Sequence, residues 1–165
     1  TDAKTDITTK IMKETGSNEE FLSLVNEMFS ENIPFNKLLR LAIESMSPDR
    51  VRVSFRMRDE LMGHRERGMV HGGVISSVID VTGGLVAFMG VQEKMDETLE
   101  AKLERFGRVS TIDLRVDFLR PGLGTTFTAT AYALRTGNKV AVTRTELTNE
   151  KEELIAAGTG SYTVS

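Results

Sequence analysis

A single carboxylate, Asp80, lies within the most apolar segment of the sequence, which runs from Gly72 to Gly90. Burying a charge in apolar surroundings costs free energy unless the charge is paired or serves a function. A carboxylate can act as a general base that takes a proton from water, or it can attack an electrophilic carbonyl carbon itself. We therefore identify Asp80 as the principal candidate for a catalytic residue, with both roles open.

Two glycines, Gly72 and Gly73, open the same segment directly after His71. If the segment is a helix, its first N–H groups have no partner within the helix and carry partial positive charge. Glycine has no side chain that would keep a ligand away from them. N–H groups in such a position stabilise the negative oxygen that develops on a carbonyl under attack. Gly72 and Gly73 are therefore predicted to polarise a carbonyl group.

The distance between Asp80 and these glycines limits how one site can use both. Eight residues separate Gly72 from Asp80, which corresponds to about 12 Å along a helix. One reacting group cannot contact both ends of that span. Either the two residues serve different steps, or one site combines Gly72 of one chain with Asp80 of another.

Helices are predicted in three places. The segment around Asp80 is apolar on nearly the whole helical wheel, which is typical of a helix buried on all sides, and we expect this helix over 72–90. Amphipathic spacing predicts a helix over 18–31, with Ser17 and Glu20 as a capping box, and another over 92–107.

Strands are predicted to make up most of the remaining chain, because apolar and polar residues alternate along it. They are expected over 38–47, 51–58, 111–118, 125–135, 139–147 and 154–164, and 59–71 is expected as a loop. Several consecutive strands, together with one helix that needs burial on every side, indicate an α+β fold. In it an antiparallel sheet wraps around the central helix.

The composition narrows the class of protein. The length suits one domain over 17–165 with a flexible tail over 1–16. A net charge of −3 does not indicate nucleic-acid binding. The chain has no cysteine, which agrees with a cytoplasmic location. No signal peptide and no uninterrupted run of about 18 apolar residues is visible, so we expect no membrane insertion. With only two histidines and no surrounding ligand motif, we expect no metal and no cofactor.

Two sequence motifs carry a resemblance to a known family. The run HGGVISSVIDVTGG over 71–84 places Asp80 seven residues after Gly73. With the order of elements, it resembles the hotdog-fold acyl-CoA thioesterases of the PaaI-like group. The run TIDLRVDFLRP over 111–121 is similar to the family's third strand and its closing proline. Residues 57–165 look most similar to the YigI-like branch, which handles medium- and long-chain acyl-CoA.

The resemblance implies an activity and an assembly. The activity is hydrolysis of acyl-CoA thioesters to free acid and CoA. In the family an N–H group at the start of the central helix holds the thioester oxygen, and Gly72 matches that position most closely. Hotdog dimers place two sites across their interface. The resemblance therefore implies a homodimer with shared active sites, or a homotetramer built from such dimers.

The resemblance also suggests accessory residues. Thr111 matches a hydroxyl residue that orients the attacking water in some relatives, although the alternation places it on the polar face of its strand. Some relatives carry Asn six or seven residues before His71, where this sequence has Arg65 and His64. His64 could donate a hydrogen bond in place of that Asn. His71 is expected to hold the loop before the helix and to lie among the residues that bind the substrate.

Cations for the phosphates of CoA are predicted from local charge. The stretch 50–67 contains six arginines, Arg65 among them, against three acids. Arg120, Arg135 and Lys139 lie at expected strand ends or turns, where relatives often bind the nucleotide. The same side chains would also suit a solvated strand face.

Two other functions are known for hotdog domains. A hotdog domain can bind acyl-CoA without hydrolysing it, but Asp80 and the helix-terminal glycines favour hydrolysis because a binder needs neither. A hotdog hydratase is disfavoured, since its D-x-x-P-x-H arrangement is missing. The apolar face of 92–107 suggests a cap over an acyl tunnel.

Overall fold

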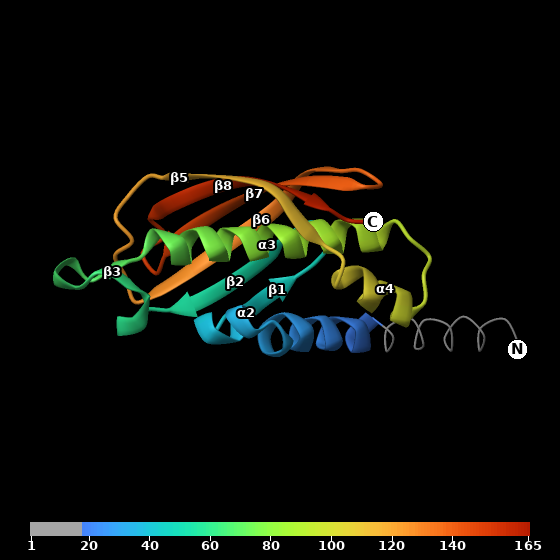
Figure 1. Cartoon of the computed structure of the whole chain (residues 1–165), viewed down its shortest axis with the longest axis horizontal. Helices are drawn as coiled ribbons and strands as arrows, with labels where there is room; N and C mark the ends of the chain where they lie inside the picture. The colour runs from blue at the N-terminus through green and yellow to red at the C-terminus, as the bar shows by residue number, and fades with distance from the viewer. Residues whose placement is uncertain (1–17) are drawn as a thin grey trace, which may run out of the picture.

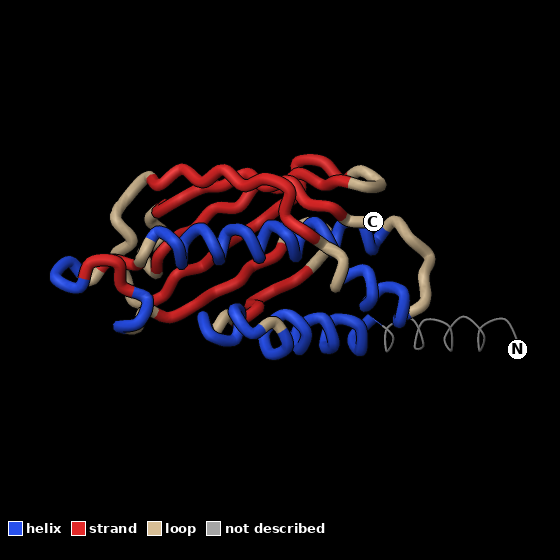
Figure 2. Tube along the Cα trace, in the orientation of Figure 1, coloured by secondary structure: helices blue, strands red, loops and turns tan. Residues whose placement is uncertain are grey.

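A six-stranded antiparallel sheet wraps around one long helix in the computed structural model, which describes residues 18–165 (Figures 1 and 2). The strand order is β1-β2-β6-β7-β8-β5. The strands are β1 (Ala42–Met46), β2 (Val51–Arg56), β5 (Ser110–Phe118), β6 (Thr126–Thr136), β7 (Val140–Asn149) and β8 (Leu154–Thr163). The predicted α+β architecture is confirmed. The predicted tail over 1–16 and the capping residue Ser17 lie outside the described residues.

The central helix, α3 (Gly72–Glu93), extends three residues beyond its predicted end. It is long enough to span a membrane, and its most apolar window has a mean hydropathy of 1.8. However, 67% of that window is buried inside the protein. The apolar character of α3 is therefore accounted for by contacts with the sheet.

Close packing between α3 and β8 explains one of the glycines within the helix. A Cβ atom at Gly83 would lie 2.5 Å from Tyr162 Oη and 2.7 Å from Thr143 Oγ1. No side chain fits at this position unless the sheet moves. Gly83 thus lets the side chain of Tyr162 lie against the backbone of α3.

The N-terminal helical region differs from the prediction at its C-terminal end. Residues 18–27 are helical, and a π-helical turn, η1 (Met28–Asn32), continues them. A short helix, α2 (Pro34–Leu39), follows, so the strand predicted over 38–47 begins only at Ala42. Proline suits the first turn of a helix because its missing N–H is not needed there. Arg40, with φ 55°, ends α2 in the left-handed conformation.

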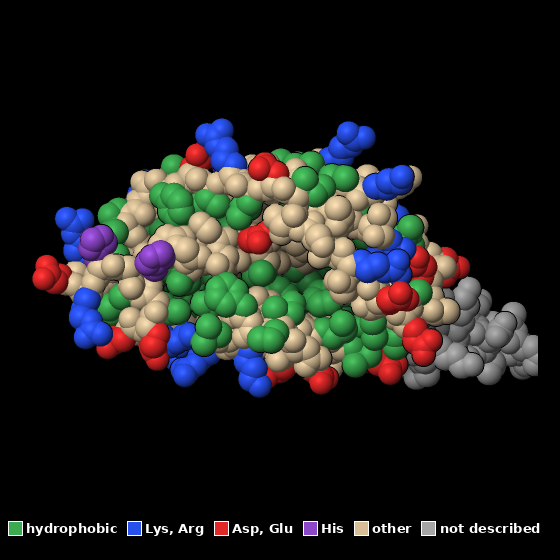
Figure 3. Space-filling model, in the orientation of Figure 1, with side chains coloured by type: hydrophobic (Ala, Val, Ile, Leu, Met, Phe, Trp, Pro, Cys, Tyr) green, Lys and Arg blue, Asp and Glu red, His purple; other side chains and the backbone are tan. Residues whose placement is uncertain are grey.

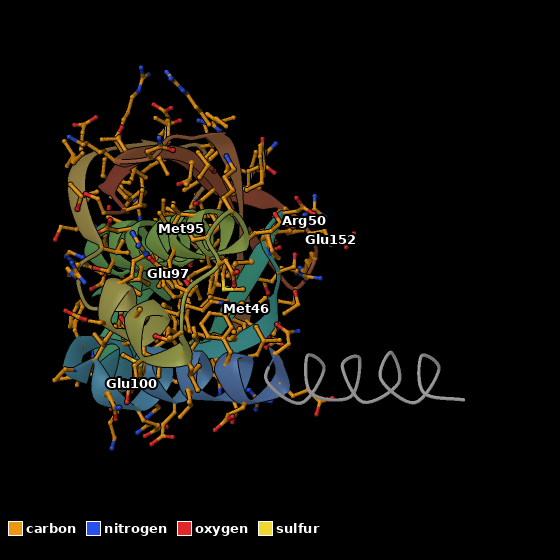
Figure 4. All side chains as sticks on the ribbon, turned by 90° about the vertical axis from the view of Figure 1, so that its right-hand side faces the viewer. Met46, Arg50, Met95, Glu97, Glu100 and Glu152 are labelled. Carbon is orange, nitrogen blue, oxygen red and sulfur yellow. The ribbon has the colours of Figure 1, made fainter. Side chains whose placement is uncertain are left out.

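Two further segments contain more and shorter elements of secondary structure than predicted. The loop expected over 59–71 contains a small hairpin of β3 (Met62–His64) and β4 (Met69–Val70), flanked by the 3₁₀ turns η2 (Asp59–Leu61) and η3 (Arg65–Arg67). The helix expected over 92–107 is shorter. Its first residues belong to α3, and α4 (Leu99–Phe106) starts after Thr98, whose side chain accepts a hydrogen bond from Ala101 N. Figure 4 looks onto this end and shows α4 below α3.

Strand β5 lies at the edge of the sheet beside β8. Several of its apolar side chains are open to solvent: Ile112 and Phe118 are each 56% exposed, and Leu119, just after the strand, is 51% exposed. Among the described residues no strand pairs with the outer side of β5. An exposed apolar edge of this kind is ready to pair with another chain.

Candidate active site

Asp80 and Thr111 form a hydrogen-bonded pair beside the middle of α3. Thr111 Oγ1 donates to Asp80 Oδ1 over 2.8 Å. Asp80 was expected to be buried, but its side chain is only half-buried because no element of the described chain covers this side of α3 fully. The carboxylate can therefore be reached by a water molecule and by a substrate.

A β-bulge brings Thr111 to Asp80. Strict alternation would put Thr111 on the same face as Asp113 and opposite to Leu114. The register with β8 shifts between Thr111 and Asp113, so that Thr111 lies opposite Tyr162 while Leu114 lies opposite Gly160. Tyr162 and Gly160 are two residues apart and share one face of β8, so Thr111 and Leu114 share that face of the sheet. A bulge inserts one extra residue into a strand and thereby changes the face of the residues beyond it. The predicted polar-face position of Thr111 is wrong for this reason.

Tyr162 holds the backbone of the same turn of α3. Its Oη donates to the carbonyl oxygen of Asp80 over 2.8 Å. Burial, together with the nearby carboxylate of Asp80, raises the pKa of Tyr162 well above its ordinary value. Tyr162 therefore stays a neutral hydrogen-bond donor and fixes the position of Asp80.

An apolar cavity of about 140 Å³ adjoins this pair. Asp80 and Thr111 line it together with residues of α3, α4 and the first helical region. The apolar lining includes Phe29, Val81, Leu85, Phe88, Phe106 and Val109. Figure 3 shows hydrophobic side chains along a recess on this face of the molecule. The carboxylate thus lies at the wall of a space suited to an apolar group.

The N-terminus of α3 offers one free N–H group where two were predicted. His71 caps the helix, and its Nδ1 accepts a hydrogen bond from Gly73 N over 2.8 Å. The N–H of Gly73, which was expected to polarise a carbonyl together with that of Gly72, is thus engaged by His71 in this structure. For Gly72 N–H no acceptor is found within residues 18–165. The expected structural role of His71 agrees with this cap.

His64 lies near the N-terminus of α3, and it is far from Asp80 along the helix. A surface cavity there is lined by His64, His71, Gly72, Phe118 and Arg120. Arg120 also donates from Nη1 to the carbonyl oxygen of Leu154 over 2.9 Å. Within one chain, the structure therefore separates the predicted site residues into two groups, one at Asp80 and one at Gly72.

The other predicted cations do not join either group. Arg65 is exposed in η3. Arg135 and Lys139 lie at the β6–β7 turn. This turn is close to the C-terminal end of α3, where Lys94 Nζ donates a hydrogen bond to Thr136 O. A helix of 22 residues is about 33 Å long, so this turn is remote from Gly72 of the same chain.

Sequence reasoning missed Tyr162, Phe29 and Phe106 as residues of the site. Tyr162 was assigned to a strand, but nothing in its local sequence shows that it reaches Asp80. The helical spacing that identified Phe29 and Phe106 as apolar positions predicts burial and gives no sign of a shared cavity. These contacts join segments far apart in the chain.

Comparison with known proteins assigns the family. Residues 67–156 match the family model described as the thioesterase superfamily. This range is more than half of the chain and includes Gly72, Asp80 and Thr111. The chain belongs to the thioesterase superfamily. The predicted family is confirmed.

Relatives of this thioesterase-superfamily chain match nearly its full length. The medium/long-chain acyl-CoA thioesterase YigI of Escherichia coli K12 is 43% identical over 147 residues, which cover 88% of this chain and 95% of that protein. A Shewanella oneidensis structure related to the thioesterase superfamily has a TM-score of 0.85 and 44% identity, covering 89% of this chain and 97% of that one. A structure from Syntrophus aciditrophicus is 57% identical, with a TM-score of 0.81 and coverage of 90% and 99%. These likenesses confirm the predicted hotdog fold.

Proposed function

We propose that the protein hydrolyses acyl-CoA thioesters of medium or long chain length. The observation that carries this proposal is the Asp80–Thr111 pair at the wall of an apolar cavity. A thioester needs a base or nucleophile at its carbonyl carbon and an apolar space for its acyl chain. The likeness to YigI, whose name states this substrate class, supports the same choice.

Asp80 acts as the general base in this proposal. Thr111 donates to Oδ1 of Asp80, which holds the carboxylate in one orientation and leaves Oδ2 available. Oδ2 takes a proton from a water molecule while the water oxygen attacks the thioester carbon. The C–S bond then breaks, and the protonated Asp80 gives its proton to the sulfur, so that CoA leaves as a thiol and the carboxylate is restored. Direct attack by Asp80 is the alternative mechanism, and it would leave an acyl group on the Asp80 peptide that rapid quenching and mass spectrometry detect.

The carbonyl oxygen is held by Gly72 N–H of a second copy of the chain. Two features support this assembly. Gly72 and Asp80 of one chain are about 12 Å apart along α3, and β5 presents a free apolar edge. Thr111 lies near the start of β5, while Phe118, at its end, lies 3.3 Å from where a Cβ of Gly72 would be. A two-fold axis near the middle of β5 would bring the start of this strand in one chain to its end in the partner.

Phosphate binding would then use cations from both ends of the molecule. Arg120 lies in the cavity beside Gly72, and Arg65 is exposed close by in sequence. Arg135 and Lys139 lie at the remote β6–β7 turn, so they contact CoA only if the assembly places them near a neighbouring subunit's site. The role of these four side chains, like that of His64 and a cytoplasmic location, stays a prediction.

The test is hydrolysis of acyl-CoA by wild type, Asp80→Ala and Asp80→Asn. Loss of general-base catalysis lowers kcat by about 10²–10⁴-fold, while both variants keep the circular dichroism spectrum of the wild type. Asparagine matches the shape of aspartate but does not accept the proton, so the two variants should lose similar activity. Equal turnover by wild type and Asp80→Asn would overturn the role of Asp80. Tight binding of acyl-CoA by wild type without any turnover would identify a non-catalytic binder instead.

A further inference from the structure

The apolar cavity beside Asp80 follows one side of α3 toward its C-terminal half. Asp80, Gly84 and Phe88 all line the cavity. Residues spaced by four lie above one another on the same face of a helix. The cavity therefore has a direction, which runs from the carboxylate past Gly84 to the ring of Phe88.

Gly84 differs from its neighbour Gly83 in what surrounds it. A Cβ atom at Gly83 would meet Tyr162 Oη at 2.5 Å, whereas a Cβ at Gly84 would meet Tyr162 Cε1 at 3.4 Å and Val109 Cγ1 at 3.9 Å. The contacts at Gly84 are ordinary van der Waals contacts, so alanine fits there. Glycine inside a helix is less favourable than alanine. Packing thus requires glycine at 83 but not at 84, where its effect is to leave the cavity open.

Aromatic rings close the far end of the cavity. The rings of Phe88 and Phe106 meet edge to face with centroids 5.1 Å apart. Phe106 is the last residue of α4, and α4 is fastened to the rest of the chain by Arg105. The Arg105 side chain pairs with Glu97 and donates from Nη1 to the carbonyl oxygen of Val164 over 2.9 Å. The end wall is therefore held in place.

The dimensions of the cavity select a chain length. Asp80 and Phe88 are separated by about 12 Å along the helix, and an extended alkyl chain advances about 1.3 Å per carbon, given C–C bonds of about 1.5 Å. The path therefore takes about nine carbons. The volume of about 140 Å³ resembles that of a cavity of about 150 Å³ that accommodates the six carbons of benzene.

We propose that this cavity receives the acyl chain and measures its length. Chains of about six to ten carbons fit between Asp80 and the end wall. Gly84 keeps the channel open, and Phe106 closes it. This inference rests on the proposed thioesterase function and narrows its substrate to medium-chain acyl groups.

Two variants should change the chain-length profile in opposite directions. Gly84→Ala narrows the channel, so the ratio of kcat/KM for decanoyl-CoA to that for butyryl-CoA should fall about tenfold, as expected when about two methylenes lose their burial. Because alanine favours the helix and fits the space, its Tm should rise by about 2–4 °C. Phe106→Ala opens the end, so the ratio of kcat/KM for tetradecanoyl-CoA to that for decanoyl-CoA should rise about tenfold.

Leu103→Ala is the matched control for the end wall. Leu103 packs on the core from the same helix α4 but does not line the cavity, so both ratios should stay at their wild-type values. If Phe106→Ala does not fold, Phe106→Leu keeps the packing and should show a smaller shift in the same direction. The inference about chain length would be overturned by unchanged ratios in the Gly84 and Phe106 variants, or by a wild type that prefers hexadecanoyl-CoA to decanoyl-CoA. Either outcome would leave the proposed thioesterase function intact. A wild type inactive on every chain length would instead overturn the thioesterase function.

Discussion

At the scale of single residues, Asp80 is held from two directions. Thr111 Oγ1 donates to one carboxylate oxygen, and Tyr162 Oη donates to the main-chain carbonyl oxygen of the same residue. The first contact orients the side chain, and the second fixes the turn of α3 that carries it. In the proposed reaction, Oδ2 of Asp80 takes the proton from water. This arrangement supports the proposed roles of Asp80 as the base and of Thr111 as the group that orients it.

Replacing Thr111 by Val tests the orienting contact, because valine has a similar shape and lacks the hydroxyl group. A hydrogen bond to a charged group contributes about 1.5–3 kcal/mol, so kcat should fall at least about tenfold if that bond orients the base. Thr111→Ser keeps the hydroxyl and should retain most of the activity. Steady-state kinetics with one acyl-CoA substrate give the kcat of both variants. A Thr111→Val enzyme with wild-type kcat would contradict the role given to this residue.

At the scale of elements, α3 carries both halves of the proposed site. Its middle bears Asp80, and its N-terminus presents Gly72 N–H. His71 is the side chain that defines this N-terminus, because its Nδ1 accepts from Gly73 N. Gly72, the first residue of the helix, lines the cavity shared with Phe118 and Arg120.

Removal of the cap should weaken the fold and the site together. His71→Ala leaves Gly73 N–H without its acceptor, and loss of an N-cap costs about 1 kcal/mol of unfolding free energy. His71→Asn should recover most of this stability, since asparagine is among the preferred N-cap residues. Urea denaturation gives the two free energies. Equal stability of the alanine and asparagine variants would show that the hydrogen bond seen at His71 does not stabilise α3.

At the scale of the whole molecule, the described chain contains two half-sites and an unpaired edge. Asp80 and Thr111 line one cavity, and Gly72 lines another. Strand β5 lies at the sheet edge with Ile112 and Phe118 exposed. The proposed two-fold assembly through this edge would cover the apolar surface and complete both sites at once.

Mixed dimers test whether the sites are shared. Gly72→Pro removes one N–H at the first helical position, where proline is well tolerated, and Asp80→Ala removes the base. Each homodimer should be inactive. A dimer with one chain of each kind regains one intact site, formed by Asp80 of the first variant and Gly72 of the second. Refolding an equal mixture should therefore restore about a quarter of the wild-type activity per chain, since half of the dimers are mixed and each has one good site.

Activity that stays absent in the mixture, while size-exclusion chromatography with differently tagged chains shows that mixed dimers have formed, would contradict the shared site. A wild-type protein that is monomeric and fully active would contradict it as well. Mixing the same two variants without refolding is the control, because exchange between preformed dimers is then limited.

Local patterns in the sequence were sufficient for the main elements. A run of apolar residues too continuous for a surface helix predicts α3, and alternation predicts most strands of the sheet. The carboxylate at 80 is conspicuous against that apolar run. The least accurate predictions concern 38–47, 59–71 and 92–107, where short helices and turns depend on Pro34, Arg40 and Thr98 as end points. Hydrophobic spacing alone does not locate such ends.

The sequence by itself was sufficient to predict the central helix and to single out Asp80 and Gly72 as candidates, since a charge or a glycine in an apolar helical pattern is a local property of one segment. The tertiary structure decided which groups these residues meet. The bulge in β5 arises from its register with β8 and turns Thr111 to Asp80. The N–H of Gly73 is lost to His71 through the geometry of the helix start. Contacts of this kind depend on pairing between distant segments, which no periodicity within a single segment encodes.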